Sequence, residues 1–186
     1  MRVFDFDNTV YNGESVFDFY IFSLRKNPRA IKFLFAVFAN LVKYKAGKTT
    51  MADLENAVKK YSKAYLAMFD NTADLVREFW DGHIHKIKAW YSPRPDDVII
   101  TASLNLIMEE LCERLGIKNC ICTVVNRQTL DVEYINFGAN KCAAFRSRFG
   151  NAPIDEFYTD NPADMPMINM AEKAFMVSKN KIKRIK

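Results

Sequence analysis

The amino-acid sequence predicts an α/β protein with a mainly parallel sheet, interrupted after its first strand by an all-helical segment. Three observations lead to this prediction. From residue 93 onward, short apolar runs alternate with helical patterns. Another apolar run lies at the start of the chain, and the roughly 80 residues between the two regions show only helical periodicity. We therefore expect a core formed by residues 1–11 and 93–186, and an inserted helical cap domain formed by residues 12–92.

The N-terminal part begins with one strand and continues with helices. Residues 2–6 form a short apolar run, which we interpret as a buried strand. Across residues 15–91, apolar side chains recur every three or four positions, the spacing of one helix face. Thr50 stands three residues before Asp53 and could cap the N-terminus of a helix. Breaks between helices are expected at Asn27-Pro28, Ala46-Gly47 and Asp70-Asn71.

The C-terminal half alternates strands with helices. The run Val98-Ile99-Ile100 is typical of a strand that is buried on both faces of a parallel sheet. Residues 129–137 could form a hairpin, and the basic tail of residues 179–186 could form an edge strand protected by its lysines. We expect strands at residues 97–101, 120–125, 155–159 and 174–177, and helices at residues 104–115, 141–149 and 166–171.

The composition is that of an ordinary folded domain, with 49% hydrophobic and 26% charged residues. No run of 18 apolar residues exists, so we expect no membrane span. Met1 is followed at once by Arg2 and soon by Asp5, which does not resemble a signal peptide. Four cysteines are few for this length and favour a reduced, cytoplasmic protein.

The net charge of +5 is unevenly distributed along the chain. Residues 179–186 contain five basic and no acidic side chains, so the rest of the chain is balanced. Residues 12–92 contain 13 basic and 8 acidic side chains, whereas the parts that flank them are acidic. A basic insert beside an acidic core favours a site for a cation and an anionic substrate, although chance could produce this excess. The tail contains no aromatic residue, so nucleic-acid binding is not expected.

Four polar signals stand at or just past the carboxyl ends of predicted strands, the edge where ligands bind in open α/β sheets. The first contains Asp5 and Asp7, two carboxylates that would repel each other beside an apolar strand. A bound cation would relieve this repulsion, and ligands that are all oxygen favour Mg²⁺. A simple turn is the alternative explanation. The others are Thr101-Ala102-Ser103, Lys141, and Asp160-Asn161-Pro162-Ala163-Asp164.

Each of the other three signals also has a structural explanation when it is considered alone. Asp160 and Asp164 could cap a helix, and Thr101 with Ser103 could form a plain N-cap. Lys141 alone is typical of a solvated surface lysine. The combination in this order is far more specific than any one member.

Taken together, the four signals resemble the four motifs of the haloacid dehalogenase superfamily, with the spacing of its phosphoserine-phosphatase-like branch. The resemblance implies a Rossmann-like, doubly wound core with a helical cap between the first and second motifs. Thr159 stands where the fourth motif often has Gly, and Pro162 lies inside that loop. The matching residues are Asp5, Asp7 and Thr9 for the first motif, Thr101 for the second, Lys141 for the third, and Asp160 and Asp164 for the fourth.

The resemblance also implies the chemistry. Asp5 would attack phosphorus and form an aspartyl-phosphate, while Asp7 would act as general acid and base. Mg²⁺ would be held by Asp5, the Asp7 main-chain carbonyl and Asp160. The remaining roles are phosphoryl contact for Thr101, charge balance at the nucleophile for Lys141, orientation of Lys141 or a metal-bound water for Asp164, and possible phosphate contacts for Ser103 and Asn8. Dehalogenases of the superfamily lack the second Asp, so Asp7 favours phosphate esters.

The substrate is left open by the sequence. A small phosphorylated metabolite is the first expectation. A lipid phosphate is the alternative, because the uncharged run of residues 33–42 is bracketed by basic residues and could lie against an anionic membrane surface. A packed core helix explains the same run without any membrane contact. A regulatory or binding protein without turnover is a further alternative, although every motif residue is present.

Overall fold

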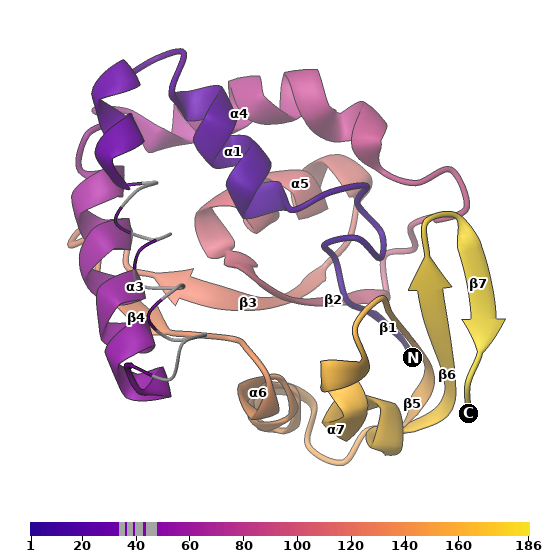
Figure 1. The fold of residues 1–186 in the computed structure, drawn as a ribbon. Helices are drawn as coiled ribbons and strands as arrows, with labels where there is room; N and C mark the ends of the chain where they lie inside the picture. Colours follow the sequence, from indigo (N-terminus) through magenta and orange to yellow (C-terminus); the bar gives the residue numbers. More distant parts are fainter. Residues whose placement is uncertain (34–35, 37–38, 40–42, 44–47) are drawn as a thin grey trace.

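A seven-stranded sheet forms the centre of the molecule. The structure is a computed structural model that describes residues 1–33, Ala36, Ala39, Lys43 and 48–186. The strand order of the sheet is β4-β3-β2-β1-β5-β6-β7 (Figure 1). The five inner strands run parallel to one another, and the edge strands β4 and β7 run antiparallel to their neighbours. The strands are β1 (Arg2–Phe4), β2 (Val98–Leu104), β3 (Asn119–Val125), β4 (Val132–Tyr134), β5 (Ile154–Thr159), β6 (Ala171–Ser178) and β7 (Lys181–Arg184).

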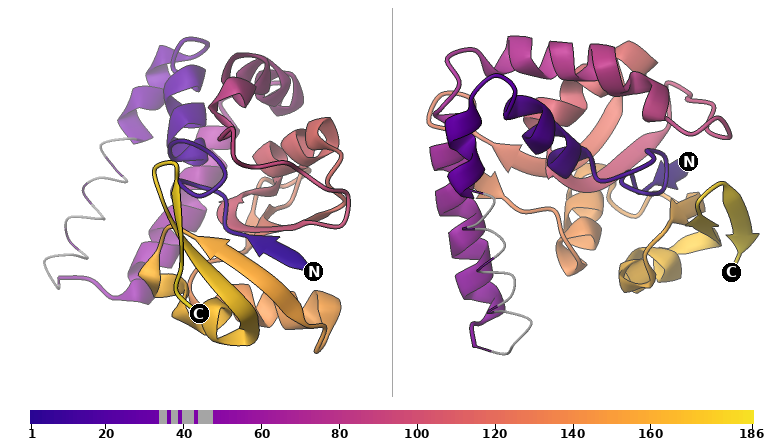
Figure 2. Two further views of the ribbon diagram at one scale, coloured as in Figure 1. Left: turned by 90° about the vertical axis from the view of Figure 1, so that its right-hand side faces the viewer. Right: turned by 45° about the horizontal axis from the view of Figure 1, so that its top comes forward.

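Helices cover both faces of this sheet. In Figure 1, α4 and α5 lie on one face, and α6 and α7 lie on the other. In Figure 2, the long helix α3 projects beyond the body of the molecule. The helices are α1 (Ser15–Ser23), η1 (Pro28–Ala30), α3 (Met51–Leu66), α4 (Thr72–His83), η2 (Ile84–Lys86), α5 (Asn105–Leu115), α6 (Ala139–Phe149), η3 (Pro162–Asp164) and α7 (Met165–Met170).

The order of the strands places β1 at the point where the winding of the sheet reverses. From β1 the chain passes outward to β2 and β3, and it returns to the other side of β1 with β5 and β6. Phe4 is in register with Ile99 of β2 and Tyr158 of β5, so the carboxyl ends of these three strands lie together. Ligands bind at such reversal points in open α/β sheets. The predicted doubly wound, mainly parallel α/β fold is confirmed.

Each face of the sheet has its own hydrophobic core. On the side of α6 and α7, Val3, Ile100 and Phe145 are buried together. On the other side, Trp80 of α4 packs against Phe6, with ring centroids 6.3 Å apart, and its indole N–H donates to the Ile107 carbonyl of α5. The helical insertion therefore shares a core with the sheet. The predicted domain limits at residues 12 and 92 stay a prediction.

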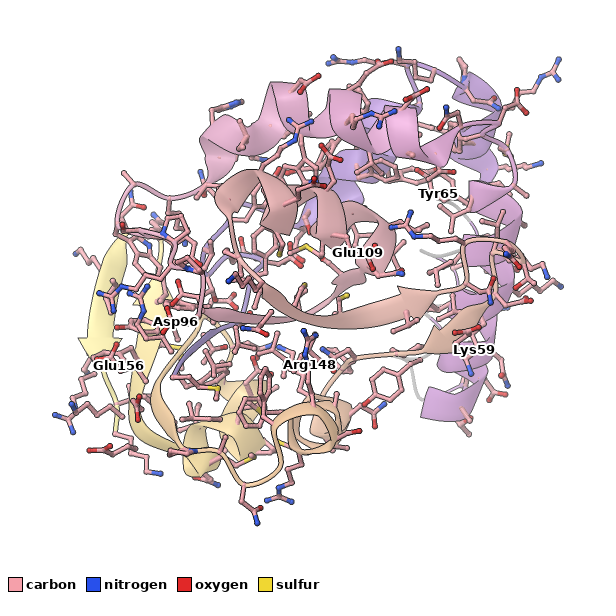
Figure 3. All side chains as sticks on the ribbon, turned by 180° about the vertical axis from the view of Figure 1, so that it is seen from behind. Lys59, Tyr65, Asp96, Glu109, Arg148 and Glu156 are labelled. Atoms are coloured by element: carbon pink, nitrogen blue, oxygen red, sulfur yellow. The ribbon has the colours of Figure 1, made fainter. Side chains whose placement is uncertain are left out.

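Capping residues set the ends of several helices, as the sequence predicted. Thr50 and Asp53 form a reciprocal capping box at the start of α3. Asn71 accepts from the Asp74 amide at the start of α4. Helix α5 ends at Gly116, whose φ of 69° lies in the left-handed region that glycine tolerates best. In Figure 3, Tyr65 lies on α3, and its hydroxyl is 2.7 Å from Ser23 Oγ, which links α3 to α1.

The hairpin predicted within residues 129–137 differs in the structure: only β4 lies in that range, and it pairs antiparallel with the preceding strand β3. The basic tail forms the exposed edge strand β7 beside β6, as predicted. Of the apolar run at residues 33–42, only Phe33, Ala36 and Ala39 belong to the described residues, so the core helix or membrane-facing segment predicted there lies mostly outside them. Phe33 is buried and contacts the Tyr65 ring. None of the helices in the described part of the chain is both long and apolar enough to cross a bilayer.

Candidate active site

The loop after β1 carries the first motif. The Asp5 amide continues the sheet by donating to the Tyr158 carbonyl at 2.9 Å. The chain then turns sharply, because the Phe6 carbonyl accepts from the amides of both Val10 and Tyr11. Asn8 lies in the left-handed region, with a φ of 56°. The strand predicted for residues 2–6 therefore ends at Phe4, since this turn competes for the hydrogen bonds of the sheet.

Asp5 is part of a buried network of charges. Lys141 Nζ on α6 donates to Asp5 Oδ1 at 2.8 Å and to Asp164 Oδ2 at 3.0 Å. Thr159 Oγ1 at the end of β5 donates to the same Asp164 oxygen at 2.8 Å. Asp5, Lys141 and Asp164 are all buried. Residues more than 130 positions apart in the chain thus meet at the predicted edge of the sheet.

Burial governs the ionisation of this network. It raises the pKa of the Asp5 carboxyl from its ordinary value to about 7, against the opposing attraction of Lys141. Burial also disfavours the charged form of Lys141, but the Asp5 and Asp164 carboxylates outweigh it and raise the Lys141 pKa. Lys141 therefore stays protonated, while full ionisation of Asp5 at neutral pH requires additional positive charge.

Asp7 is held by a different set of groups. Its Oδ1 accepts from the Ser15 amide, the first amide of α1, at 2.6 Å. Its Oδ2 accepts from Ser103 Oγ at 2.7 Å, and Thr101 Oγ1 lies 3.5 Å from the same oxygen. The start of α1 and the end of β2 together fix the orientation of the Asp7 side chain.

Asp160 completes the acidic cluster and bears on the expected metal. Thr9 Oγ1 lies 3.4 Å from Asp5 Oδ2 and 3.5 Å from Asp160 Oδ1, so both carboxylates face one hydroxyl. Burial raises the pKa of Asp160 as well as that of Asp5. Two partly desolvated carboxylates this close fit a hard divalent cation such as Mg²⁺. Among the described residues, no three His, Cys, Asp or Glu side chains converge as a metal site, and the expected ligand set contains only two side chains.

Two predicted phosphate contacts have other partners. Ser103 is buried, and its Oγ bonds to Asp7 and lies 2.7 Å from Ser15 Oγ. Asn8 Nδ2 donates to Glu14 Oε1 at 2.6 Å. These contacts favour a role for both side chains in fixing the loop and Asp7. Their phosphate contacts stay predictions.

Two residues beside the site were missed by the sequence analysis. The buried Asn136 uses its Nδ2 to donate to the carbonyls of Thr101 in β2 and Ile121 in β3, which links these two strands. Glu14 lies close enough to Asp7 and Asp160 that burial and their charges raise its pKa. A carboxylate shortly after the first motif was a visible signal for Glu14, whereas nothing in the local sequence distinguishes Asn136.

The sequence profile of the haloacid dehalogenase-like hydrolases matches residues 3–169. A comparison with curated proteins gives no match. A solved structure from Bordetella pertussis Tohama I, of unknown function, has a TM-score of 0.72 at 16% identity and covers 94% of this chain and 87% of its own.

Two further solved structures are similar. A phosphoserine phosphohydrolase-like protein from Francisella tularensis subsp. tularensis SCHU S4 has a TM-score of 0.57 at 18% identity, covering 94% of this chain and 86% of its own. A HAD family hydrolase from Salmonella enterica subsp. enterica serovar Typhi has a TM-score of 0.56 at 17% identity, covering 91% and 59%. At these identities the likeness shows a shared fold.

The profile match begins inside β1 and extends through most of α7, so it includes every residue of the four predicted motifs. The same residues form the buried Asp5–Lys141–Asp164 network and the neighbouring Asp7 and Asp160. The chain belongs to the haloacid dehalogenase-like hydrolases.

Proposed function

We propose that the protein is a Mg²⁺-dependent phosphomonoester hydrolase in which Asp5 is the nucleophile. The observation that carries this proposal is the pair of carboxylates at the end of β1. Asp5 is held by a buried lysine, and Asp7 is held separately by α1 and Ser103. One carboxylate is thereby oriented for attack and the other for proton transfer. The similar protein from Francisella tularensis is described as phosphoserine phosphohydrolase-like, which agrees with this chemistry.

In the first step, an oxygen of Asp5 attacks phosphorus while the bond from phosphorus to the ester oxygen breaks. Asp7 gives a proton to that oxygen, so the substrate leaves as a neutral alcohol. The phosphoryl group is then bonded to Asp5, which divides one difficult displacement into two easier ones. Lys141 offsets the negative charge around Asp5 throughout, and Asp164 with Thr159 keeps its ammonium in place.

In the second step, water attacks phosphorus and Asp7 takes its proton. The bond between phosphorus and Asp5 breaks, which releases inorganic phosphate and restores the Asp5 carboxylate. Thr101 lies beside Asp7 and would donate a hydrogen bond to a phosphoryl oxygen. The protons balance over the two steps, because Asp7 loses one and then regains one.

Asp5, Asp160 and the main-chain carbonyl of Asp7 would hold the divalent cation. When bound, the cation would supply the positive charge that lets an anionic carboxylate approach an anionic phosphate ester. It would also provide the additional charge that the raised pKa of Asp5 calls for. The proposed ligands are hard oxygen donors, which Mg²⁺ prefers.

The first expected substrate is a small phosphorylated metabolite in the cytoplasm. A lipid phosphate is the second candidate, because α1 begins at the Asp7 contact and carries the exposed apolar side chains Val16, Phe17 and Ile21. Phosphate release from soluble phosphomonoesters and from a lysophospholipid phosphate, presented with anionic or neutral vesicles, separates the two. We expect turnover of the soluble esters that does not depend on vesicles. Turnover confined to the lipid substrate on anionic vesicles would select the second candidate.

The test of the central proposal is phosphate release from a chromogenic aryl phosphate. Activity should vanish in chelator and return with Mg²⁺. Ca²⁺ should bind without supporting turnover, since it accepts more oxygen ligands and can hold both oxygens of the attacking carboxylate. Full activity in the presence of chelator would contradict the role assigned to Asp5 and Asp160.

A further inference from the structure

A second lysine is buried beside the site. Lys88 follows η2, and its side chain is 6% exposed. Lys88 and Lys141 are the only lysines buried among the described residues. Unlike Lys141, Lys88 takes part in none of the ion pairs found in the described part of the chain. A buried ammonium must be hydrogen-bonded to offset its desolvation, so its acceptors indicate its purpose.

The two acceptors are main-chain carbonyls from distant parts of the chain. Lys88 Nζ donates to the carbonyl of Asn8, in the loop that follows Asp7, and to the carbonyl of Lys179 at 2.7 Å. Lys179 lies in the turn between β6 and β7, which reaches the segment after α4 in Figure 1. The ammonium thus connects the loop of the first motif to the C-terminal hairpin.

Both acceptor residues have strained backbone conformations. Among the described residues, only three other than glycine have a positive φ, and two of them are Asn8 at 56° and Lys179 at 54°. Such conformations persist only where the surroundings hold them, and they cluster at functional sites. Lys88 binds the carbonyls of both residues, which is the kind of contact that keeps them in place.

The backbone around Lys88 also forms hydrogen bonds with the loop that follows Asp7. The Lys88 amide donates to the Val10 carbonyl at 2.8 Å, and the Asn12 amide donates to the Lys86 carbonyl at 2.9 Å. The segment around Lys88 therefore runs beside the whole turn that carries Asp7 and Thr9. Its side chain reaches the carbonyl of Asn8, the residue next to Asp7.

Charge balance gives Lys88 a second role. Five carboxyl groups lie at or beside the site: Asp5, Asp7, Glu14, Asp160 and Asp164. A divalent cation and Lys141 would supply three positive charges, fewer than the carboxyl groups, so the charge of Lys88 would reduce the remaining negative charge. Burial lowers the pKa of Lys88, and the Asp160 carboxylate opposes this shift.

We infer that Lys88 is a positioning residue for the reaction, which fixes the loop of Asp7 against the β6–β7 hairpin and adds a second buried positive charge beside the metal-binding carboxylates. The inference rests on the proposed function. It also makes the C-terminal hairpin part of the active-site scaffold.

The test compares three variants of the full-length protein. Lys88→Met removes the charge and the hydrogen bonds and keeps most of the side-chain volume. Lys88→Gln removes the charge, retains an amide donor and tolerates partial hydration, in case the first variant does not fold. Lys63→Met is the control. Lys63 lies on α3, its side chain is half exposed, and it forms a surface ion pair with Asp131. Circular dichroism and thermal unfolding establish that each variant is folded.

We expect kcat to fall by ~10-fold or more in both Lys88 variants with little change in KM, since misplacement of a reacting group by about 1 Å can cost ~100-fold. Amide hydrogen exchange should accelerate by about 10-fold or more at residues 8–13 and at the β6–β7 turn, while α5 is unchanged, because the loss of one charged hydrogen bond opens the loop locally. The control should match the wild type in both measurements.

A purely structural lysine would give a different result. Folded Lys88 variants with wild-type kcat and unchanged exchange at residues 8–13 would overturn the inference. So would uniform acceleration of exchange over the whole molecule, which indicates lost global stability. Hydrogen exchange requires no turnover. If the wild type releases no phosphate, the proposed function fails, while the effect of Lys88 on the loop is still measured.

Discussion

The two carboxylates of the first motif are held by different parts of the molecule. Asp5 is fixed by α6 and the segment after β5, which belong to the sheet and its own helices. Asp7, only two residues further on, is fixed by the first residue of α1 and by the end of β2. The described contacts of the proposed nucleophile thus lie outside α1, whereas the proposed proton donor is held by α1. Under the proposed mechanism, a change in the position of α1 would alter proton transfer before it altered attack on phosphorus.

The strongest test of this difference is Asp5→Asn. Turnover should fall by at least ~10³-fold, because the amide neither attacks phosphorus nor holds Mg²⁺ well, and enzymes supply accelerations of ~10⁶-fold or more. Single-turnover phosphate release measures the loss. Asp155→Asn is the matched control, since that exposed carboxylate pairs with the chain terminus and should tolerate the change. An Asp5 variant with more than about a thousandth of the wild-type rate would refute the covalent assignment.

Asp7→Asn should produce a loss that depends on the leaving group. Alkyl phosphates should lose ~10²–10⁴-fold, the usual contribution of a general acid, whereas aryl phosphates should lose much less, because their leaving oxygens need no proton. The measurement is kcat/KM for a series of esters with leaving groups of different basicity. Equal losses across the series would show that Asp7 serves structure or metal binding instead.

Ser103→Ala sharpens the comparison, because it removes a contact to Asp7 and none to Asp5. Loss of one hydrogen bond to a carboxylate should cost ~10-fold in turnover of alkyl phosphates. Formation of the Asp5 intermediate from an aryl phosphate, followed as a burst, should be nearly unchanged. Ser147→Ala on the exposed face of α6 is the control. If the burst falls as much as alkyl turnover does, Ser103 acts on Asp5 or the phosphate directly.

The smallest expected effect is on stability in the absence of metal. Burial raises the pKa of Asp5 to about 7 in the folded protein, whereas in the unfolded chain the pKa takes its ordinary value of 3.8. Between these values the folded state binds more protons, so the free energy of unfolding should fall as the pH rises. The fall should be on the order of 2–4 kcal/mol and should be absent in Asp5→Asn. Urea unfolding in chelator at several pH values measures it, and identical profiles for both proteins would contradict the burial of an unbalanced Asp5.

Local patterns in the sequence predicted most of the elements. The alternation of apolar runs and helical patterns predicted the parallel strands, because a strand buried on both faces must be continuously apolar. The N-cap at Thr50 was also predicted, since it depends only on neighbouring residues. The length of β1 was wrong, because the Phe6 carbonyl is used by the following turn instead of the sheet.

The motif residues were predicted as a set, but most of their partners were not. The order of strands explains why Asp5, Thr101, Lys141 and Asp160 meet, since parallel strands end at one edge of the sheet. The contacts of Ser15, Asn136 and Lys88 arise from segments that the local sequence does not connect. No local sequence pattern marks any of these three residues as part of the site.

By itself, the sequence determined the fold class and the identity of the acidic residues at the site, because hydrophobic periodicity and the spacing of carboxylates are local properties. Only the tertiary structure decided which groups hold each carboxylate. It placed Asp5 against Lys141 and Asp7 against α1. It also joined the loop at Asn8 to the C-terminal hairpin through Lys88. The physical reason is that buried charges must find partners wherever the packed chain provides them, and those partners lie far away in sequence.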